Sequence, residues 1–322
     1  MRKTGLFLAS IALSATLWAE LPEKKGLDVI NRANAEAYIG FLASDALEGR
    51  EAGFRGGRIA GEYIVSNLKT MGIEPLFESY YQPFEAYNKE RQKKGRFQVH
   101  PDSIAKLKQG VHQKLSMNNI LGKIEGKNPN EYVIIGAHYD HLGFDPMLDG
   151  DRVYNGADDN ASGVSAVLQV AKAFLATGVQ PERTVIFAFW DGEEKGLLGS
   201  KYFVQTFLEM DKVKGYLNYD MIGRNKDESK PMHVVYFYTE AHPVFGDWLK
   251  NDIKKYGLNL TPDYRPWDKP VGGSDNASFA LLDIPVIWYH TDGHPDYHMP
   301  SDHVEKINWN KIVDITKASF LN

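Results

Sequence analysis

The stretch Gly136-Ala-His-Tyr-Asp-His141 decides the fold, and it directly follows the apolar run Tyr132-Val-Ile-Ile135. A short apolar run of this kind is typical of a buried strand. Side chains two positions apart on an extended chain point the same way, so His138 and Asp140 share one face where the strand ends. A metal-bound imidazole usually donates its other N–H to a carboxylate. The segment therefore indicates a metal ligand, His138, with Asp140 as its orienting partner.

From residue 119 onward, patterns typical of strands alternate with helical patterns. Strand-like runs cover residues 132–137, 184–190, 215–219, 234–238 and 285–289. Helical spacing covers residues 162–176, 196–208 and 243–256, and a final helix runs from residue 309 to the C-terminus. Two earlier helical patterns cover residues 31–42 and 57–71. The alternation predicts a single α/β domain, in which a mostly parallel mixed sheet is sandwiched by helices.

Acidic side chains and imidazoles follow the ends of these strands. Open α/β sheets form their sites at the carboxyl ends of strands, so these groups should meet at one edge. They lie in Asn155-Gly-Ala-Asp-Asp-Asn-Ala-Ser-Gly163, Asp191-Gly-Glu-Glu194, Asp220 and Asp296-Tyr-His-Met-Pro-Ser-Asp302. So many carboxylates would repel one another without a cation. A mixture of imidazole and carboxylate suits zinc or another borderline divalent metal, whereas calcium favours oxygen ligands alone. Two ions would balance the charge better than one.

The adjacent pair Glu193 and Glu194 indicates two different roles. Neighbouring side chains diverge, so the two carboxylates cannot easily serve one metal in the same manner. One can bind metal while the other acts as a general base on water. Asp158 has a simpler interpretation, because it could cap the helix that is expected to begin near Ser162.

Together these motifs resemble the di-zinc aminopeptidase family that also contains glutamate carboxypeptidase, transferrin receptor and glutaminyl cyclase. The likeness rests on Ala137-His-Tyr-Asp140, Gly156-Ala-Asp-Asp-Asn-Ala-Ser-Gly163, Glu193-Glu-Lys-Gly-Leu-Leu-Gly-Ser200 and Asp296-Tyr-His298. Weaker matches are Leu47-Glu-Gly-Arg50, Asn119-Ile-Leu-Gly122 and Lys306-Ile-Asn308. The resemblance implies a zinc-exopeptidase fold, without the protease-associated insert of larger relatives, and two Zn²⁺ ions per chain. It implies that His138 and Asp220 hold one zinc, that Glu194 and His298 hold the other, that Asp159 bridges them, that Glu193 is the general base and that Asp140 orients His138.

The same resemblance implies a metallo-exopeptidase that hydrolyses the N-terminal bond of peptides with a free N-terminus. Tyr297 is expected beside the tetrahedral oxyanion, and Ser274 is expected to contact substrate, with Gly272, Gly273 and Phe279 shaping the side-chain pocket. The chain departs from the family where it reads Ser274-Asp-Asn276, because relatives commonly have Ser-Asp-His. His141 and His294 could line the rim of the pocket, but we expect each to be an ordinary loop histidine.

Three alternatives carry different expectations. A glutaminyl cyclase on this scaffold would be a transferase with one zinc. A non-catalytic binding module like transferrin receptor would lack ligands, and no ligand is missing here. The family typified by acetylornithine deacetylase orders its ligands similarly, but a long dimerisation domain separates its fourth and fifth ligands. Only 77 residues separate Asp220 from His298 in this chain, which favours the first family.

The composition and the N-terminal residues indicate where the protein is located relative to the cell. The 322 residues carry a formal net charge of −5 and no cysteine, so the chain forms no disulfides and gives no support for nucleic-acid binding. Residues 1–19 combine a basic start with a short apolar run, which predicts a secretory signal peptide ahead of a peptidase domain at 20–322. We expect a periplasmic or secreted protein with no stable membrane insertion after signal removal. The basic run at 89–114 is expected to be a solvated loop or edge face.

Overall fold

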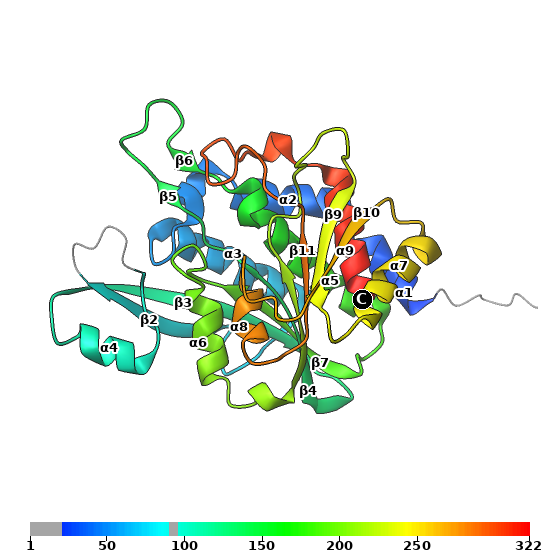
Figure 1. Ribbon diagram of the computed structural model, residues 1–322, viewed down its shortest axis with the longest axis horizontal. Coiled ribbons are helices and arrows are strands. Elements are labelled where there is room, and N and C mark those ends of the chain that lie inside the picture. The colour runs from blue at the N-terminus through cyan, green and yellow to red at the C-terminus, as the bar shows by residue number, and fades with distance from the viewer. Residues whose placement is uncertain (1–20, 90–95) are drawn as a thin grey trace, which may run out of the picture.

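A mixed sheet of nine strands forms the centre of the protein (Figure 1). The computed structural model describes residues 21–89 and 96–322, so the expected signal peptide lies outside the described residues. Eight of the strands follow the order β1-β3-β7-β4-β8-β11-β9-β10, and β2 pairs with β3 at one edge. Their bounds are β1 (Glu74–Pro75), β2 (Tyr81–Lys89), β3 (His112–Ile124), β4 (Asn128–His138), β7 (Arg183–Trp190), β8 (Val213–Tyr219), β9 (His233–Thr239), β10 (Thr261–Trp267) and β11 (Val286–His290). A separate two-stranded ribbon joins β5 (Gly143–Phe144) to β6 (Val153–Tyr154).

The four central strands β7, β4, β8 and β11 are mutually parallel. Their carboxyl ends therefore lie at the same edge of the sheet, where the predicted site residues follow them. The outer pairs β3–β7 and β11–β9 are antiparallel. The predicted mostly parallel α/β sheet is confirmed for this central part, and the five predicted strands correspond to β4, β7, β8, β9 and β11.

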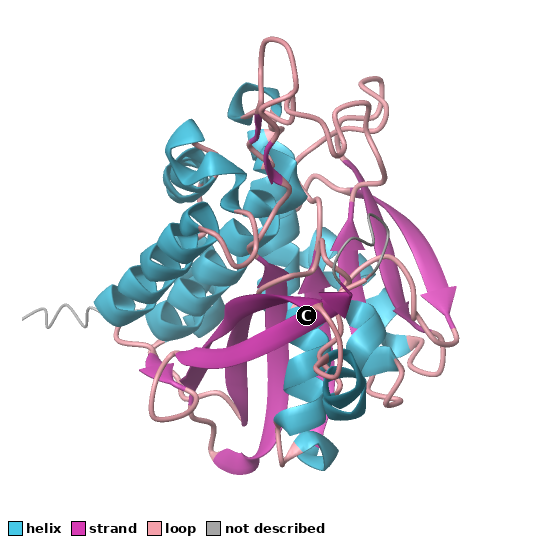
Figure 2. Ribbon diagram, turned by 90° about the vertical axis from the view of Figure 1, so that its left-hand side faces the viewer, coloured by secondary structure: helices cyan, strands magenta, loops and turns pink. Residues whose placement is uncertain are grey.

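Helices cover both faces of the sheet (Figure 2). On one face α5 packs on β4, β7 and β8, and it contacts α1, α2 and α9 in turn. On the opposite face α6 and α8 pack on each other and on the sheet. The helix bounds are α1 (Pro22–Val29), α2 (Arg32–Leu42), α3 (Arg55–Met71), α4 (Pro101–Leu107), α5 (Gly163–Thr177), α6 (Leu198–Thr206), α7 (Val244–Tyr256), α8 (Asn276–Ala280) and α9 (Trp309–Leu321). None of the helices in the described ranges is long and apolar enough to cross a bilayer.

Burial on both faces explains why β4 is apolar from Tyr132 to Ala137. Ile135 and Ala137 belong to the core cluster under α5, whereas Tyr132 and Ile134 belong to the cluster under α6 and α8. Successive side chains of a strand point to opposite faces, so a strand between two helix layers needs apolar residues at every position. This packing fixes the end of β4, and with it His138.

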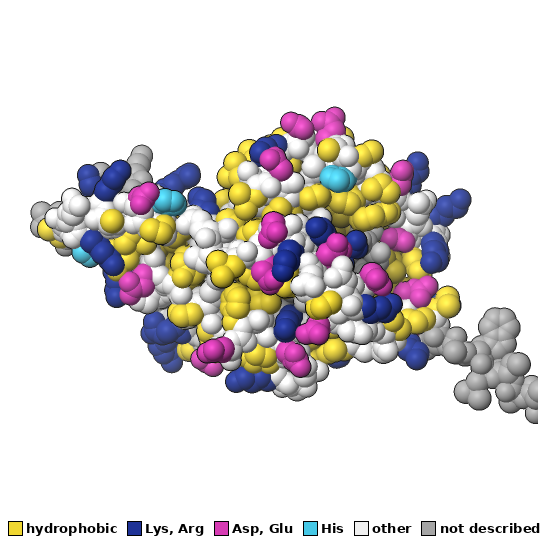
Figure 3. Space-filling model, turned by 90° about the horizontal axis from the view of Figure 1, so that it is seen from below, with side chains coloured by type: hydrophobic (Ala, Val, Ile, Leu, Met, Phe, Trp, Pro, Cys, Tyr) yellow, Lys and Arg dark blue, Asp and Glu magenta, His cyan; other side chains and the backbone are white. Residues whose placement is uncertain are grey.

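The described part of the basic run, residue 89 and residues 96–114, lies in an arm formed by β2, α4 and β3 at the edge of the sheet. The arm projects from the body of the protein, and its Lys and Arg side chains are prominent in the view from below (Figure 3). The sequence analysis assigned no strands here, although it did expect an edge face. β2 and β3 pair along nine residues, from Tyr81 opposite Ile120 to Lys89 opposite His112.

Gly136 tests the packing on the α6 side of β4. A Cβ atom at this position would lie 2.8 Å from Trp190 Nε1 and 2.9 Å from Tyr216 Oη, two buried rings that are hydrogen bonded to each other. We expect Gly136→Ala to lower the free energy of unfolding by about 1–3 kcal/mol, because the packed rings must shift. Urea denaturation measures the change.

Gly215→Ala in β8 is the matched control, since its Cβ would meet nothing closer than Pro285 O at 3.7 Å. We expect this variant to be as stable as the wild type or up to about 1 kcal/mol more stable, because it lowers the backbone entropy of the unfolded chain. Equal unfolding midpoints for the two variants would contradict the packing described for Gly136.

Candidate metal centre

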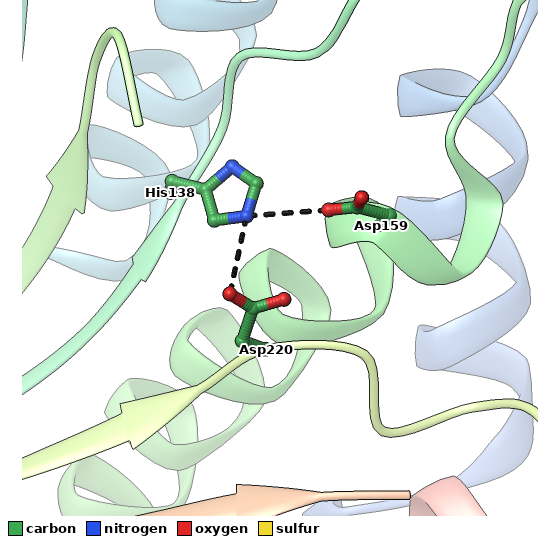
Figure 4. Close-up of side chains that lie close together, drawn as sticks. All are labelled: His138, Asp159 and Asp220. Carbon is green, nitrogen blue, oxygen red and sulfur yellow. Dashed lines mark ion pairs between the residues drawn. The ribbon is translucent and has the colours of Figure 1, made fainter. Parts of the chain in front are cut away.

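Five predicted ligands converge at the carboxyl edge of the sheet. His138 is the last residue of β4, and Asp220 directly follows β8. Asp159 lies in the helical turn Ala157–Ser162 that precedes α5. Glu194 lies in the loop after β7, and His298 in the loop after β11. Figure 4 shows the side chains of His138, Asp159 and Asp220 pointing toward one another from three separate elements.

The first group consists of His138, Asp159 and Asp220. His138 Nε2 lies 3.3 Å from Asp159 Oδ1 and 3.6 Å from Asp220 Oδ2. Zinc bonds of about 2.0–2.2 Å in a tetrahedral arrangement separate ligand atoms by about 3.3–3.6 Å. All three side chains are buried, and their spacing matches that of ligands around one zinc ion.

The second group uses the other oxygen of the same aspartate. His298 Nε2 lies 3.2 Å from Asp159 Oδ2 and 3.1 Å from Glu194 Oε2. These separations are again those of ligands to one small cation. Because Asp159 presents Oδ1 to one group and Oδ2 to the other, its carboxylate has the position of a bridge between two metals.

The pKa shifts at this edge of the sheet show that its carboxylates favour positive charge nearby. Burial alone would lower the pKa of His138, but the carboxylates of Asp220, Asp140 and Asp159 outweigh it and raise that pKa well above its usual value. Burial likewise opposes the charged form of His298, whereas Asp159 and Glu194 raise its pKa to about 10. Burial raises the pKa of Glu193 well above its usual range, and the charge of His138 only partly offsets this. A divalent cation between these carboxylates would supply the charge that the imidazoles otherwise take up as protons.

Asp140 connects the end of β4 to the loop after β7. Its Oδ1 accepts the Glu193 N–H at 3.0 Å, and its Oδ2 accepts the Glu194 N–H at 3.4 Å. Its Oδ1 also lies 3.6 Å from His138 Nδ1, while the Asp140 main-chain oxygen is 3.2 Å from that nitrogen. The orienting role toward His138 stays a prediction. The hydrogen bonds add a second role, because they place the predicted base and the predicted ligand together.

Asp158 does not cap α5, although the sequence left that interpretation open. Its Oδ1 accepts the Gly223 N–H at 2.6 Å, and Asn160 Oδ1 instead accepts the Gly163 N–H at the start of α5. Asp302 Oδ2 accepts the N–H groups of Asp158 and Asp159 at 2.9 and 3.1 Å. Asp159 therefore lies in a turn that is hydrogen bonded to the loop after β11.

That loop has an anchor of its own. Asp296 accepts hydrogen bonds from Arg224 Nη2 at 2.7 Å, Ser301 Oγ at 2.6 Å and Lys306 Nζ at 2.6 Å. Although burial opposes it, this set of donors holds the pKa of Asp296 well below its usual range. The fixed carboxylate limits how far His298, two residues later, can move.

Arg50 also contacts the turn that carries Asp159. Its buried guanidinium donates to the main-chain oxygens of Tyr139, Leu42, Asn155, Gly156 and Asp159 at 2.6–3.4 Å. Burial lowers the pKa of Arg50 to about 10, so the side chain stays charged at neutral pH. The planar guanidinium of Arg50 thus links a carbonyl group at the end of β4 to carbonyl groups of the Asp159 turn. The weak sequence match at Leu47-Glu-Gly-Arg50 gave no sign of this role.

Two histidines lie deeper than the sequence analysis expected. His141 is buried rather than at the rim, and its Nδ1 lies 2.7 Å from Glu194 Oε1 and 3.9 Å from Asp159 Oδ2. It is therefore an additional partner or ligand for the second group, and its spacing of three residues from His138 was the signal available in the sequence. His294 is also buried, with Nε2 at 3.2 Å from Asp158 Oδ2.

The predicted substrate residues lie beside the metal-binding groups. The Tyr297 ring stacks on His298 with centroids 3.9 Å apart, and the residue is 47% exposed. Ser274 is buried, and its Oγ accepts a hydrogen bond from Asn218 Nδ2 at 3.0 Å. Asn276, where relatives commonly have histidine, turns its amide to the main-chain oxygens of Pro270 and Gly272, at 2.6 and 3.0 Å. It supports the Gly272–Gly273 loop and is not among the residues that line the pockets at the site.

A pocket of about 290 Å³ opens onto both metal-binding groups. We call it the acidic pocket, because Asp159, Glu193 and Asp220 line it together with Met221, Gly273 and Trp288. The ligands form one wall, and the buried side chains of Met221 and Trp288 contribute to another. The pocket combines a charged wall that can hold a cation with an apolar wall that can take a side chain.

Comparisons with known proteins identify the family. The model of peptidase family M28 matches residues 119–321, the part that carries all the predicted ligands. The chain belongs to peptidase family M28. The resemblance inferred from the sequence motifs is thereby confirmed.

Individual relatives match over part of their length. Leupeptin-inactivating enzyme 1 of Streptomyces exfoliatus is 34% identical over 170 residues, which cover 52% of this chain and 34% of that protein. An aminopeptidase of Pseudomonas aeruginosa is 38% identical over 115 residues, or 35% of this chain and 19% of that protein. The chain thus spans about a third or less of the length of these relatives.

Solved structures share the whole fold at lower identity. A zinc aminopeptidase from Bacillus subtilis superposes with a TM-score of 0.68 at 17% identity, covering 90% of this chain and 94% of that one. The Legionella pneumophila LapA aminopeptidase gives 0.67 at 22% identity, covering 100% and 78%. The predicted zinc-exopeptidase fold in a single domain is confirmed.

Substitution of Arg50 tests its role beneath the turn. We expect Arg50→Lys to lower the free energy of unfolding by about 2–5 kcal/mol, because lysine cannot reach all five carbonyl groups and leaves buried acceptors unpaired. Urea denaturation of metal-free protein measures the change without a contribution from bound metal. Arg55→Lys is the control, since Arg55 is exposed and pairs only with Glu48, and it should change stability by no more than about 0.5 kcal/mol. Equal effects of the two substitutions would contradict the role given to Arg50.

Proposed function

We propose that this protein is a metallo-aminopeptidase that removes the N-terminal residue of peptides with the help of two zinc ions. One observation carries the proposal: Asp159 joins two ligand groups, and Glu193 lines the same pocket without belonging to either group. His138 and Asp220 would hold one zinc, Glu194 and His298 the other, and Asp159 both. The imidazole and carboxylate donors fit zinc, and the spacing of their atoms fits its bond lengths.

Zinc bound at these residues would polarise the substrate carbonyl and make a water molecule acidic enough to lose a proton near neutral pH. The protein's own part begins with Glu193, whose raised pKa suits a carboxylate that takes up the proton of the attacking water and then holds it. As the C–O bond forms and the peptide C–N bond breaks, Glu193 returns that proton to the leaving amine. Tyr297, half-exposed at the pocket, is placed to hydrogen bond the oxyanion.

The charges of the acidic pocket support cleavage at the N-terminus. Glu193 and the carboxylates that would hold zinc can accept hydrogen bonds from a free α-ammonium group, whereas a blocked N-terminus lacks these donors. Met221, Gly273 and Trp288 offer an apolar wall to the first side chain. The volume of about 290 Å³ suits one residue rather than a length of peptide. Export to the periplasm or beyond stays a prediction from residues 1–19.

A substrate panel tests the proposed activity. We expect release of free leucine from leucine amide and from Leu-Gly-NH₂, and no hydrolysis of the N-acetylated forms, because only the free amine meets the carboxylates. A chelator should abolish release, and added zinc should restore it with about two ions bound per chain. Cleavage of blocked peptides alone would overturn the proposal. Loss of ammonia from an N-terminal glutamine without release of an amino acid, at one zinc per chain, would instead favour a cyclase.

Glu193 and Glu194 provide a contrast between neighbouring carboxylates. We expect Glu193→Gln to lower kcat by about 10²–10⁴-fold with zinc content unchanged, because the general base is lost but no ligand is. Glu194→Gln should instead lower the zinc content, since it removes a ligand of the second group. Metal analysis together with steady-state kinetics separates the two effects. Turnover retained in Glu193→Gln would remove this residue as the base.

A further inference from the structure

A second pocket of about 610 Å³ adjoins the acidic pocket. Glu193, Gly273, Tyr297 and His298 line both pockets, so the two meet at the proposed base and at the second ligand group. A peptide bond positioned for attack near Glu193 therefore has one pocket on each side. The substrate residue before the bond and the residue after it must occupy different pockets.

The second pocket carries the opposite charge, and we call it the basic pocket. Three cationic side chains line it, namely Arg96, Lys195 and Lys201. Its two acidic residues, Glu193 and Glu194, are those already assigned to the base and to a metal ligand. Lys195 is neutralised, because its Nζ lies 2.8 Å from Glu51 Oε1. Within the described ranges, no carboxylate forms an ion pair with Arg96 or Lys201.

Arg96 and Lys201 come close together at Gly196. Lys201 Nζ donates a hydrogen bond to Gly196 O at 2.8 Å, and a Cβ atom at Gly196 would lie 3.9 Å from Arg96 Cδ. Burial lowers the pKa of Lys201, and the nearby charge of Arg96 lowers it further. Arg96 comes from the arm between β2 and β3, whereas Lys201 comes from α6. Two separate elements therefore bring positive charge into one pocket at the site, and the charges of Asp275 and Glu193 only partly offset it at Lys201.

We propose that the basic pocket binds a carboxylate carried by the residue that follows the scissile bond. This inference rests on the proposed function, since it concerns the leaving side of the same reaction. The carboxylate is either the α-carboxylate of a dipeptide or the side chain of aspartate or glutamate in a longer peptide. Arg96 and Lys201 bind it by charge-assisted hydrogen bonds, which are stronger than those between neutral groups.

The charges and shapes of the two pockets set the direction of the substrate. Arg96 and Lys201 attract a carboxylate and repel a free α-ammonium group, so the N-terminus of the substrate is disfavoured in the basic pocket. The acidic pocket is the smaller one and has room for one residue beside Met221 and Trp288. The basic pocket has about twice the volume and takes the rest of the peptide. The side chain of Phe97 adds an apolar surface beside the cations.

Paired substrates test the inference in the zinc-loaded full chain. For the side-chain source, we expect kcat/KM for Leu-Glu-NH₂ to exceed that for Leu-Gln-NH₂ about 10-fold, a ratio equivalent to roughly 1.4 kcal/mol. For the α-carboxylate source, the comparison is Leu-Gly against Leu-Gly-NH₂. A preference in either pair supports the pocket and shows which source it accepts. Both preferences should weaken at high ionic strength, because the cations are partly solvated.

Variants locate the preference in the basic pocket. We expect Arg96→Gln combined with Lys201→Met to bring the acidic-to-neutral ratio near 1. The matched control is Lys106→Met, which removes one positive charge from the same arm at an exposed position in α4 and should leave the ratio as in the wild type. A ratio that survives the double substitution overturns the inference. So does an equal fall for acidic and neutral substrates, which indicates damage to packing rather than loss of a carboxylate site.

Leucine amide separates failure of this inference from failure of the proposed function, because it carries no carboxylate and has no residue after the scissile bond. If the wild type hydrolyses leucine amide but shows a ratio near 1 in both pairs, the basic pocket does not select a carboxylate and the aminopeptidase proposal stands. If the zinc-loaded chain hydrolyses none of the substrates, the proposed function is overturned and the inference falls with it.

Discussion

The concentration of negative charge at the carboxyl edge of the sheet is the constraint on which the site depends. Asp140, Asp159, Glu193, Glu194 and Asp220 lie together at this edge, and Asp140, Asp159 and Asp220 are buried. Buried carboxylates are stable only when protons, imidazoles or metal ions compensate them. Accordingly, although burial opposes both shifts, neighbouring carboxylates raise the pKa of His138, and neighbouring histidines lower the pKa of Asp159. A divalent ion in each ligand group would satisfy this demand directly.

Neutral main-chain groups hold this charged edge in place. Arg50 binds carbonyl oxygens on the β4 end and on the Asp159 turn, and Asp302 binds the amides of the same turn. Asp140 binds the amides of Glu193 and Glu194. In each case the charged side chain forms hydrogen bonds with peptide groups and thereby positions a loop that carries site residues. Loops that carry functional residues on a rigid scaffold are held here by a few buried charges.

The acidic pocket and the basic pocket beside the metal-binding groups also differ in charge. Asp159, Glu193 and Asp220 line the acidic pocket, whereas Arg96 and Lys201 line the basic pocket. A peptide substrate has a similar separation of charge when the residue after its first bond is acidic or C-terminal. Its α-ammonium group is then positive, and that residue carries a carboxylate. The division depends on the arm of β2 and β3, which adds Arg96 from a segment that precedes the family match at residue 119.

The amino-acid sequence alone predicted the central strands and the helices between them, and its resemblance to a known family implied five candidate ligands that the fold brings together. Apolar runs between covered faces and polar residues at strand ends are local patterns, and their meaning needs no knowledge of distant contacts. The tertiary structure decided the rest. Only the packed fold shows that His141 and His294 are buried. Only the fold shows that Asn160 rather than Asp158 accepts the first N–H of α5, and that Arg50 donates hydrogen bonds to the Asp159 turn. Only the fold brings Arg96 from the arm to Lys201 on α6, because residues 105 positions apart meet through strand pairing and not through any repeat in the sequence. Local pattern fixes which groups are present at a strand end, whereas their neighbours, burial and charge depend on contacts between elements far apart in the chain.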